Sequence, residues 1–188
     1  MPSPTSTERL VTRLLQGPTN IGRSPINTGD KILETIEGGL FGLQIEVAAF
    51  TQAVTTADLN FGRQIFTFAK AGRLKIVQAR VDVSLVSDGV ATLVNGEVGL
   101  GTALASGAAD TLASTEENLF AGGNATFTAV AAGATERVQG TDIDKTAVDA
   151  TSAAPSIYLN VGIDGGVAGD FTVSGTVEVI GHFVPVHD

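Results

Sequence analysis

The chain lacks several residue types on which common kinds of functional site depend. Its 188 residues include no cysteine, no tryptophan and a single tyrosine. Without cysteine it has no disulfide framework, no thiolate metal site and no cysteine nucleophile. Aromatic residues make up only 5% of the chain. The apolar residues are therefore mainly Ala, Val, Leu and Ile, which favours closely packed sheets over an aromatic-walled ligand pocket.

Membrane-spanning and targeting segments are not expected from the sequence. No stretch of about 18 uncharged apolar residues occurs, which a transmembrane helix would need. The N-terminus lacks a basic start followed by a continuous apolar run, so we expect no signal peptide. A chain of 188 residues is long enough to bury a sizeable core, and we expect one domain plus a tail.

Charge is distributed unevenly along the chain. The net charge is −9, but residues 1–80 carry +3 and residues 81–188 carry −12. The acidic body argues against a nucleic-acid partner, because it would repel the phosphates. The less acidic N-terminal part is either the docking side for an acidic partner or a simple consequence of how the body is solvated. The sequence leaves both interpretations open.

The N-terminal region predicts a short amphipathic helix over residues 6–16. Thr5 and Glu8 have the spacing of a capping box, and Gly17 stands where the helix would end. The apolar residues that fall on one face of this helix are Leu10, Val11, Leu14 and Leu15. A helix this short is marginal by itself, so we predict that its apolar face binds a partner. The alternative is that the helix packs back on its own domain.

The predicted helix is followed by the sequence GPTNIGRSPINTGD, whose Gly, Pro, Asn and Ser content is typical of an extended arm. A long arm is unusual within a compact monomer, whereas an arm that reaches across a neighbouring subunit is common. From Gly42 onward the pattern changes to an alternation of period two. We therefore predict an N-terminal arm with a short helix over residues 1–41 and a β-domain over residues 42–188.

Two segments alternate clearly between apolar and polar residues, which predicts half-buried strands. The predicted inward residues are Val77, Ala79, Val81, Val83 and Leu85 in one segment, and Phe171, Val173, Val177, Val179 and Phe183 in the other. A third alternating segment, residues 157–163, is joined to the last strand by the turn IDGGVAGD, which predicts an antiparallel hairpin. Further strands are predicted at residues 43–54, 64–69, 91–100 and 125–131.

The remaining segments predict a helical turn within residues 114–120 and a long polar surface loop over residues 132–155. Many short strands separated by Gly-rich turns, without long helical patterns, indicate an all-β fold. We predict an antiparallel β-sandwich or jelly-roll with an extended N-terminal arm that carries the short helix.

No catalytic or cofactor-binding residues are predicted. The two histidines, His182 and His187, would point to opposite faces of one strand end, and we expect structural or solvated roles for them. No strand–turn–helix elbow for a serine nucleophile and no phosphate-binding glycine motif occur. Glu116 and Glu117 are adjacent, so their carboxylates diverge and do not form a glycosidase pair. We therefore predict that the protein is not an enzyme.

No metal site is predicted either. Asp142, Asp144 and Asp149 come closest to a calcium-binding loop, but the required ligand spacing fails at Lys145. Two further acidic residues, Asp164 and Asp170, flank a glycine turn. Turn residues often need acidic side chains for local hydrogen bonds.

The arm, the cysteine-free body rich in Ala, Gly and Thr, and the ending IYLNVGIDGG…GDFTVSGTVEVIGHF together resemble the small proteins that decorate or cement the capsids of tailed bacteriophages. The most specific part is the segment Ser156 to Phe183, about a seventh of the chain. The resemblance implies a sandwich that forms homotrimers on the outer capsid surface and bridges neighbouring major capsid protein subunits by its N-terminal arm. That family has no fixed functional motif, so no binding residues are carried over.

The expected function is therefore that of a structural virion protein, with the major capsid protein and further copies of itself as partners, and with neither nucleic acid nor membrane. The alternative is a head-fibre or tail-fibre module that binds a host receptor or glycan, because fibre proteins share this composition. The polar segment 132–155 would then be a recognition loop. The scarcity of aromatic side chains for stacking on sugars weakens a glycan-binding interpretation.

Overall fold

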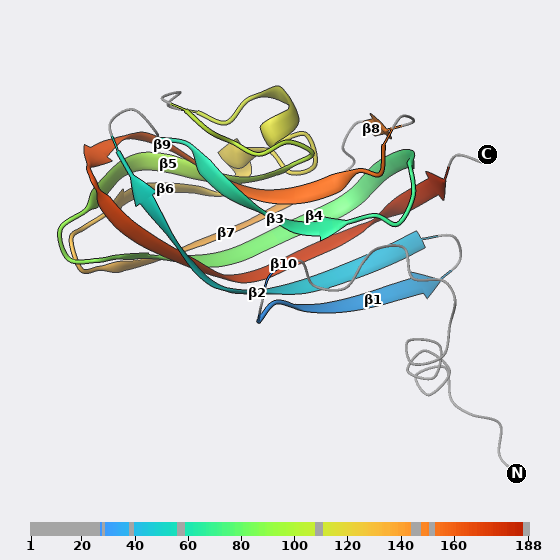
Figure 1. Ribbon diagram of the computed structural model, residues 1–188, viewed down its shortest axis with the longest axis horizontal. Helices are drawn as coiled ribbons and strands as arrows, with labels where there is room; N and C mark the ends of the chain where they lie inside the picture. The colour runs from blue at the N-terminus through green and yellow to red at the C-terminus, as the bar shows by residue number, and fades with distance from the viewer. Residues whose placement is uncertain are drawn as a thin grey trace, which may run out of the picture.

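A computed structural model shows that the protein folds into two antiparallel β-sheets packed face to face (Figure 1). It describes residues 27, 29–37, 40–55, 59–107, 111–143, 148–150 and 153–185. The strands are β1 (Lys31–Glu37), β2 (Leu40–Val54), β3 (Phe61–Thr67), β4 (Gly72–Ser87), β5 (Thr92–Gly101), β6 (Thr126–Val130), β7 (Thr135–Ile143), β8 (Val148–Ala150), β9 (Ser156–Val167) and β10 (Gly169–Pro185). Two single-turn 3-10 helices, η1 (Ser114–Glu116) and η2 (Gly122–Asn124), lie between β5 and β6.

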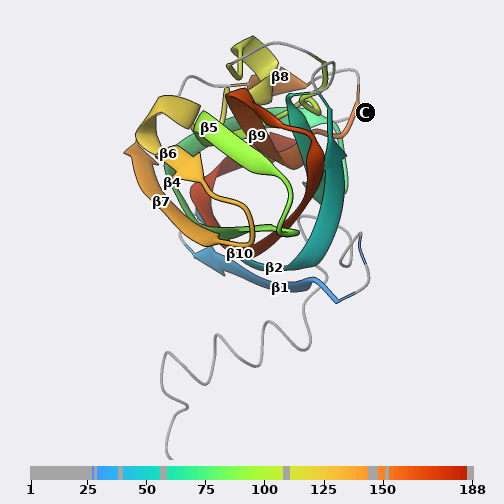
Figure 2. The ribbon, with the colours of Figure 1, turned by 90° about the vertical axis from the view of Figure 1, so that its left-hand side faces the viewer.

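The strand order is that of a jelly-roll. One sheet has the order β1-β2-β10-β4-β7, with β8 also paired to β4, and the other has the order β3-β9-β5-β6. The pairs β2–β10, β3–β9, β4–β7 and β5–β6 are successive parts of one antiparallel ribbon, and they alternate between the two sheets. Eight strands rolled up in this way make a jelly-roll, to which β1 and β8 are added. Figure 2 shows the sheets curving round a common interior. The predicted all-β, antiparallel sandwich is confirmed.

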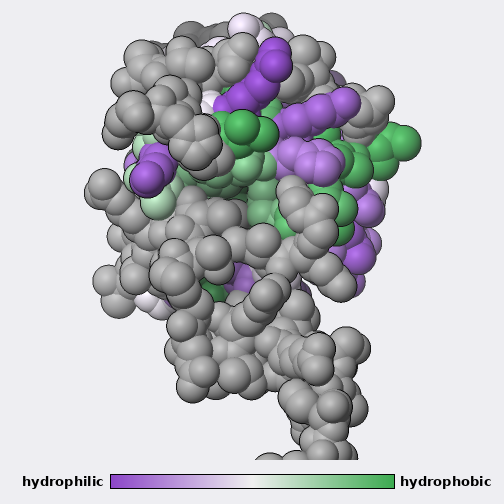
Figure 3. All heavy atoms as spheres, turned by 90° about the vertical axis from the view of Figure 1, so that its right-hand side faces the viewer, coloured by the Kyte–Doolittle hydropathy of each residue, from purple (hydrophilic) through white to green (hydrophobic). Residues whose placement is uncertain are grey.

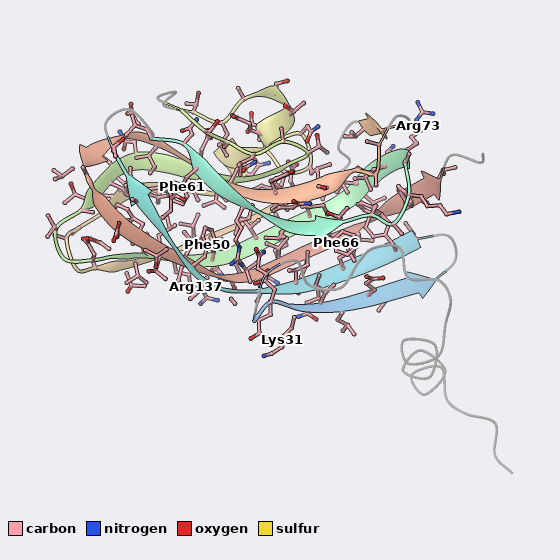
Figure 4. All side chains as sticks on the ribbon, in the orientation of Figure 1. Lys31, Phe50, Phe61, Phe66, Arg73 and Arg137 are labelled. Carbon is pink, nitrogen blue, oxygen red and sulfur yellow. The ribbon has the colours of Figure 1, made fainter. Side chains whose placement is uncertain are left out.

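The core lies between the sheets, because every second side chain of a strand points to the same face. Phe68 lies within it, with its ring centroid 5.5 Å from that of Phe41, 5.1 Å from that of Phe66 and 4.5 Å from that of Phe183. The predicted inward residues that are fully buried are Ala79, Val81, Val83, Leu85, Phe171, Val173, Val177 and Val179. Burying a large apolar side chain contributes roughly 1.5–3 kcal/mol. In Figure 4 the labelled Phe66 lies within the body, whereas Lys31 points out from its lower edge.

One predicted inward residue, Val77, points outward. Ile180 of β10 pairs with Gln78, and the next residue, Gly181, pairs with Ile76, so Val77 has no partner in the ladder. This is a β-bulge, in which an extra residue on one strand reverses the alternation. Val77 is 38% exposed. The alternation in the sequence is misleading here because the extra residue is itself apolar.

Two predictions for the second half of the chain are wrong. Strands β9 and β10 do not form a hairpin, because β9 lies between β3 and β5 whereas β10 lies between β2 and β4 of the other sheet. The predicted surface loop over residues 132–155 contains β7, which pairs with β4 along nine residues, and β8. Only Val138 of β7 is fully buried, so this edge strand has almost no apolar alternation by which to be recognised.

The sandwich begins with β1 at Lys31 rather than at residue 42, because β1 pairs with β2 along its whole length. The predicted helix over residues 6–16 lies outside the described residues. A helical turn is present near its predicted place, as η1. Within the described part of the chain, no helix has the length and apolar character to cross a membrane.

Candidate interaction surfaces

The described residues form no cavity of the size that small-molecule sites need. The best-formed hollow, lined by Val54, Leu59, Leu93 and Val167 among others, opens to solvent and encloses no room for a molecule the size of water. Small-molecule sites usually measure roughly 300–1,000 Å³. Functional surfaces must therefore be sought on the outer faces of the two sheets.

Part of the outer face of the four-stranded sheet, around Gly99, Gly101 and Asn160, is covered by the chain itself. We call residues 102–125, between β5 and β6, the covering loop; residues 108–110 of it lie outside the described part. The covering loop lies against glycine residues of β5, which have no side chain to hold it away from the sheet. A Cβ atom at Gly99 would lie 2.7 Å from the side chain of Leu112, and one at Gly101 would collide with the backbone at Thr115. Leu112 is only 4% exposed. These glycines permit the close approach of the loop to the sheet.

Asn160 of β9 fastens the covering loop to the sheet. Its side chain is fully buried. Its Nδ2 donates to the carbonyl oxygens of Ala103 and Glu116, at 2.9 and 2.7 Å, and its Oδ1 accepts from the backbone N–H of Ala105 at 3.1 Å. Asn60 donates to the carbonyl of Thr111 at 3.1 Å. The buried amide of Asn160, with both its nitrogen and its oxygen hydrogen-bonded, holds the backbone of the loop in one place.

Three acidic residues also hold the covering loop, each by accepting a backbone N–H. Leu112 donates to Glu97 at 2.6 Å, Gly122 to Glu117 at 2.7 Å, and Ala121 to Asp142 at 3.0 Å. Burial raises the pKa of Glu97, and the charge of Glu117 raises it further. In the described ranges no group of three acidic or histidine side chains could hold a metal ion. Of the predicted calcium-loop residues, Asp142 serves this structural role, and Asp144 and the side chain of Asp149 lie outside the described part.

The remaining acidic candidates lie at turns. Asp88, which the sequence analysis did not single out, accepts the backbone N–H groups of Val90, Ala91 and Asp170. The hydrogen bonds from Ala91 and Val90 lower the pKa of its carboxyl group. Asp164 accepts from the side chain of Asn95 at 3.3 Å. Asp164 and Asp170 are thus not brought together.

The outer face of the six-stranded sheet is open and carries long side chains. Lys31 pairs with Glu46 at 2.9 Å, and Arg137 forms a two-pronged contact with Asp82, at 2.8 and 2.6 Å. The Arg137 guanidinium lowers the pKa of Asp82 to about 2. This face also carries His182, which is exposed as predicted, whereas His187 lies outside the described residues.

Apolar side chains cross this open face in one band, which we call the outer apolar row. It consists of Leu33 of β1, Ile180 of β10, the bulged Val77 of β4 and Ile143 of β7, which are 47%, 40%, 38% and 70% exposed. Gly42, Ile180, Gln78 and Ile143 are successive partners across the sheet. Val77 adjoins Gln78, and Leu33 lies two residues along β1 from Thr35, the partner of Gly42. Val184, 61% exposed, lies further along β10, towards the end of the molecule seen in Figure 3, where hydrophobic and hydrophilic residues are mixed.

The start of β1 is fastened at the seam between the sheets. Asp30 has a fully buried side chain that accepts from Arg63 of β3 at 2.7 Å and from the backbone N–H of Ala48 of β2 at 2.8 Å. The Arg63 guanidinium lies 4.3 Å from the ring centroid of Phe50. Asn27 donates to Asp30 and to the carbonyl of Gln64. The point at which residues 1–26 join the body is therefore fixed.

The predicted partner-binding residues, Leu10, Val11, Leu14 and Leu15, lie outside the described residues. Glu116 and Glu117 diverge, as their adjacency suggested: Glu116 accepts from the backbone N–H of Ala113, whereas Glu117 accepts from that of Gly122. The outer apolar row could not be found from sequence, because its members come from four strands and one of them is exposed only through the bulge.

No protein-family model and no curated protein matches the chain. Solved structures with some similarity include CBM22-1–GH10 modules of an endo-1,4-beta-D-xylanase from Clostridium thermocellum (TM-score 0.30, 12% identity), the MgGH51 α-L-arabinofuranosidase (0.28, 13%) and a family two carbohydrate esterase from Cellvibrio japonicus (0.22, 8%). They match 82%, 91% and 85% of this chain, which covers only 25%, 26% and 36% of theirs. Similarity at this level carries no inference about function.

Proposed function

We propose that the protein is a structural virion protein that decorates the outer surface of a tailed-phage capsid, self-associates as a homotrimer and cements neighbouring major capsid protein subunits. The observation that carries the proposal is the contrast between its outer faces. One is partly covered by the chain's own loop, and the other presents the outer apolar row and charged side chains to solvent. A rigid block with one open face is suited to assembly with other protein surfaces.

The roles of the acidic residues support a structural protein rather than an enzyme. Glu97, Glu117, Asp142 and Asp88 each accept backbone N–H groups that hold a loop or turn. A general acid or base needs a site in which a substrate can approach it. The described residues place these carboxylates against backbone and provide no such cavity.

The alternative function is a head-fibre or tail-fibre module that binds a host receptor or glycan. The polar segment 132–155, interpreted as its recognition loop, gives it less support than the sequence suggested, because residues 135–143 form β7, which is hydrogen-bonded into the sheet along β4. The composition that it shares with fibre proteins still supports it, and we favour capsid decoration.

In this proposal the N-terminal segment attaches the protein to neighbouring subunits on the shell, with Leu10, Leu14 and Leu15 as apolar anchors. Burying three leucines would contribute roughly 5–8 kcal/mol before the cost of ordering the segment is subtracted. Since the ordering cost removes much of this gain, the loss of the leucines should have a strong effect.

The test is co-sedimentation of the full-length protein with purified expanded capsid shells. We expect saturable binding by the wild type and none by a variant in which Leu10, Leu14 and Leu15 are replaced by serine, with unchanged melting of the β-domain. Replacing Thr12 and Gln16, on the opposite helical face, by alanine is the matched control and should leave binding intact. Binding of the wild type to a glycan array but not to shells would contradict the proposal. So would a triple serine variant with a lowered melting temperature whose binding to shells falls only in proportion to the unfolded fraction.

A further inference from the structure

We propose that the covering loop is a pH-sensitive clasp, which lies closed over the four-stranded sheet in mild acid and opens more frequently once the carboxyl group of Glu97 is ionised. The inference concerns the isolated protein and does not depend on the proposed function. Opening would uncover the part of β5 and β9 on which the loop lies, around Gly99, Gly101 and Asn160. The exposure of one sheet face would thereby depend on the pH of the surroundings.

Glu97 of β5 lies between two parts of the covering loop. On one side its Oε1 accepts the backbone N–H of Leu112 at 2.6 Å. On the other side the loop returns at Gly122, where a Cβ atom would lie 2.6 Å from both Cδ and Oε2 of Glu97. Gly122 is itself buried. The closed loop therefore keeps water away from part of this carboxyl group, and opening would return the group to water.

A second carboxyl group meets Glu97 at the same place. Glu117 accepts the backbone N–H of Gly122 at 2.7 Å, so the side chains of Glu97 and Glu117 both reach Gly122. Burial and a like charge each disfavour the ionised form of a carboxyl group. Burial raises the pKa of Glu97, the hydrogen bond from Leu112 lowers it, and the charge of Glu117 raises it, with a net increase.

The parts of the chain that meet the covering loop are acidic. Residues 81–136 and strand β9 contain neither lysine nor arginine. The acidic residues of the loop and of the strands packed against it, within the described part of the chain, are Glu97, Glu116, Glu117, Asp142 and Asp164. Strands β3 and β7 each carry one arginine, but Arg63 binds Asp30 and Arg137 binds Asp82. No printed contact pairs Glu97 with a basic side chain, so its ionised form gains only the hydrogen bond from Leu112.

The closed loop also contains backbone strain. Ser114, the first residue of η1, has a φ of 52°, in the left-handed region that residues other than glycine seldom occupy. The backbone beside it is held by Thr102 and Ala103, whose N–H groups donate to the carbonyl of Thr115 at 2.8 and 3.0 Å. Because opening relieves this strain, the loop costs less to open, and a single ionisation has a measurable effect.

The direction of the pH response follows from proton binding. When the loop opens, water reaches Glu97 and its pKa returns towards the ordinary value of 4.5. The closed form therefore binds the proton more tightly than the open form does. Its extra stability is present in full below the ordinary value and is lost as pH rises through the raised pKa. Above the raised pKa, the fraction of open loop stays constant.

Hydrogen exchange of the full-length protein at pH 4 and pH 7 tests this response, after correction for the intrinsic pH dependence of exchange. The reporters are the amides of Ala105 and Phe120, which donate to Asn160 Oδ1 and to the carbonyl of Leu100. Neither amide binds a carboxylate. Amides in the β4–β10 ladder measure global unfolding and serve as the internal reference.

We expect the loop of the wild type to open about threefold more at pH 7 than at pH 4. Glu97→Gln keeps an oxygen that accepts from Leu112 but cannot ionise, so its loop should open equally at both values. Glu117→Gln should reduce the response, because it removes the like charge. Asp164→Asn is the matched control, since Asp164 lies on the same sheet but accepts from Asn95, and it should keep the wild-type response.

Equal opening of the wild-type loop at both pH values would overturn the inference. So would an unchanged response in Glu97→Gln, because other carboxyl groups would then cause it. Greater opening of Glu97→Gln than of the wild type at pH 7 would also overturn it, since the ionised carboxylate would then hold the loop closed. If Glu97→Gln does not fold, an unreduced response in Glu117→Gln is the outcome that would contradict the inference.

Discussion

The outer face of the four-stranded sheet has glycines at the positions where the chain itself covers part of it, whereas the outer face of the six-stranded sheet carries long side chains and is open. On the first face, Gly99, Gly101 and Gly162 let the covering loop lie against the strands, and Asn160 fastens it. On the second, salt bridges and the outer apolar row meet the solvent. The comparison shows that one jelly-roll can cover part of one face with its own chain and leave the other face open.

The largest effect on stability is expected from a substitution in the core, because both sheets pack against it. Val81→Asp would place an unpaired charge at a fully buried position of β4, at a cost of several kcal/mol, and should unfold the domain. Thr176→Lys is the control on the open face, because Thr176 lies between the register partners Glu46 and Asp82. Thermal unfolding by circular dichroism measures both. A midpoint for Val81→Asp within a few degrees of the wild type would show that the two faces of β4 are assigned the wrong way round.

A smaller but still large effect is expected at the covered face. Asn160→Ala would remove three hydrogen bonds to the covering loop and should lower the free energy of unfolding by about 3 kcal/mol. It should also make residues 102–125 susceptible to limited proteolysis. Gln44→Ala, an exposed amide on the open face, should change stability by less than about 0.5 kcal/mol. Equal sensitivity of the two variants would remove the distinction between the faces.

Glu97→Gln sharpens the comparison by testing the charge beneath the covering loop. Burial raises the pKa of Glu97 above its unfolded-state value. At pH values above the raised pKa, the ionised carboxylate therefore destabilises the folded protein. The folded protein regains this stability as the pH falls through the raised pKa. Glutamine keeps an oxygen that accepts from Leu112 but carries no charge. We expect a melting temperature about 2 °C higher at pH 7, with the difference disappearing in acid. A lower melting temperature at pH 7 would mean that the charge holds the loop.

The smallest effect is expected at the exposed pair Asp82–Arg137. The pKa of Asp82 in the folded protein, about 2, is below the ordinary value of 3.8. Its contribution is therefore present in full above the ordinary value and is lost as pH falls towards 2. Exposed pairs contribute at most about 1 kcal/mol, so Asp82→Asn should lower stability slightly at pH 7 and not at pH 2. An equal loss of stability at pH 7 and at pH 2 would mean that the substitution acts through packing and not through charge.

Sequence predicted the fold class well because the central strands alternate strongly. Val81, Val83 and Leu85 of β4, and Phe171 and Val179 of β10, are buried between sheets as their pattern indicated. The pattern failed where strands lie at an edge or carry a bulge. Strand β7 has one buried apolar residue, and the apolar residue Val77 is the extra residue of the bulge.

The candidate surfaces were beyond sequence reasoning for a different reason. Asn160, Glu97 and Gly99 act together because the paired strands β9 and β5 place them on one face, although Asn160 is far from the other two in the sequence. The supposed hairpin between residues 157–163 and 171–184 failed because a short turn can connect two sheets as readily as two neighbouring strands. Local pattern carries no information on which sheet a strand joins.

Light scattering coupled to size-exclusion chromatography tests the central claim, that the open face is the assembly surface, most directly. The wild-type chain, of 19.1 kDa, should elute with a mass that is a multiple of this value. The variant with Ile143→Ser and Ile180→Ser should elute at 19.1 kDa, and a variant with Val90→Ser and Leu104→Ser, exposed residues elsewhere, should retain the wild-type mass. A wild-type mass of 19.1 kDa at every concentration, or equal dissociation of both variants, would contradict the claim.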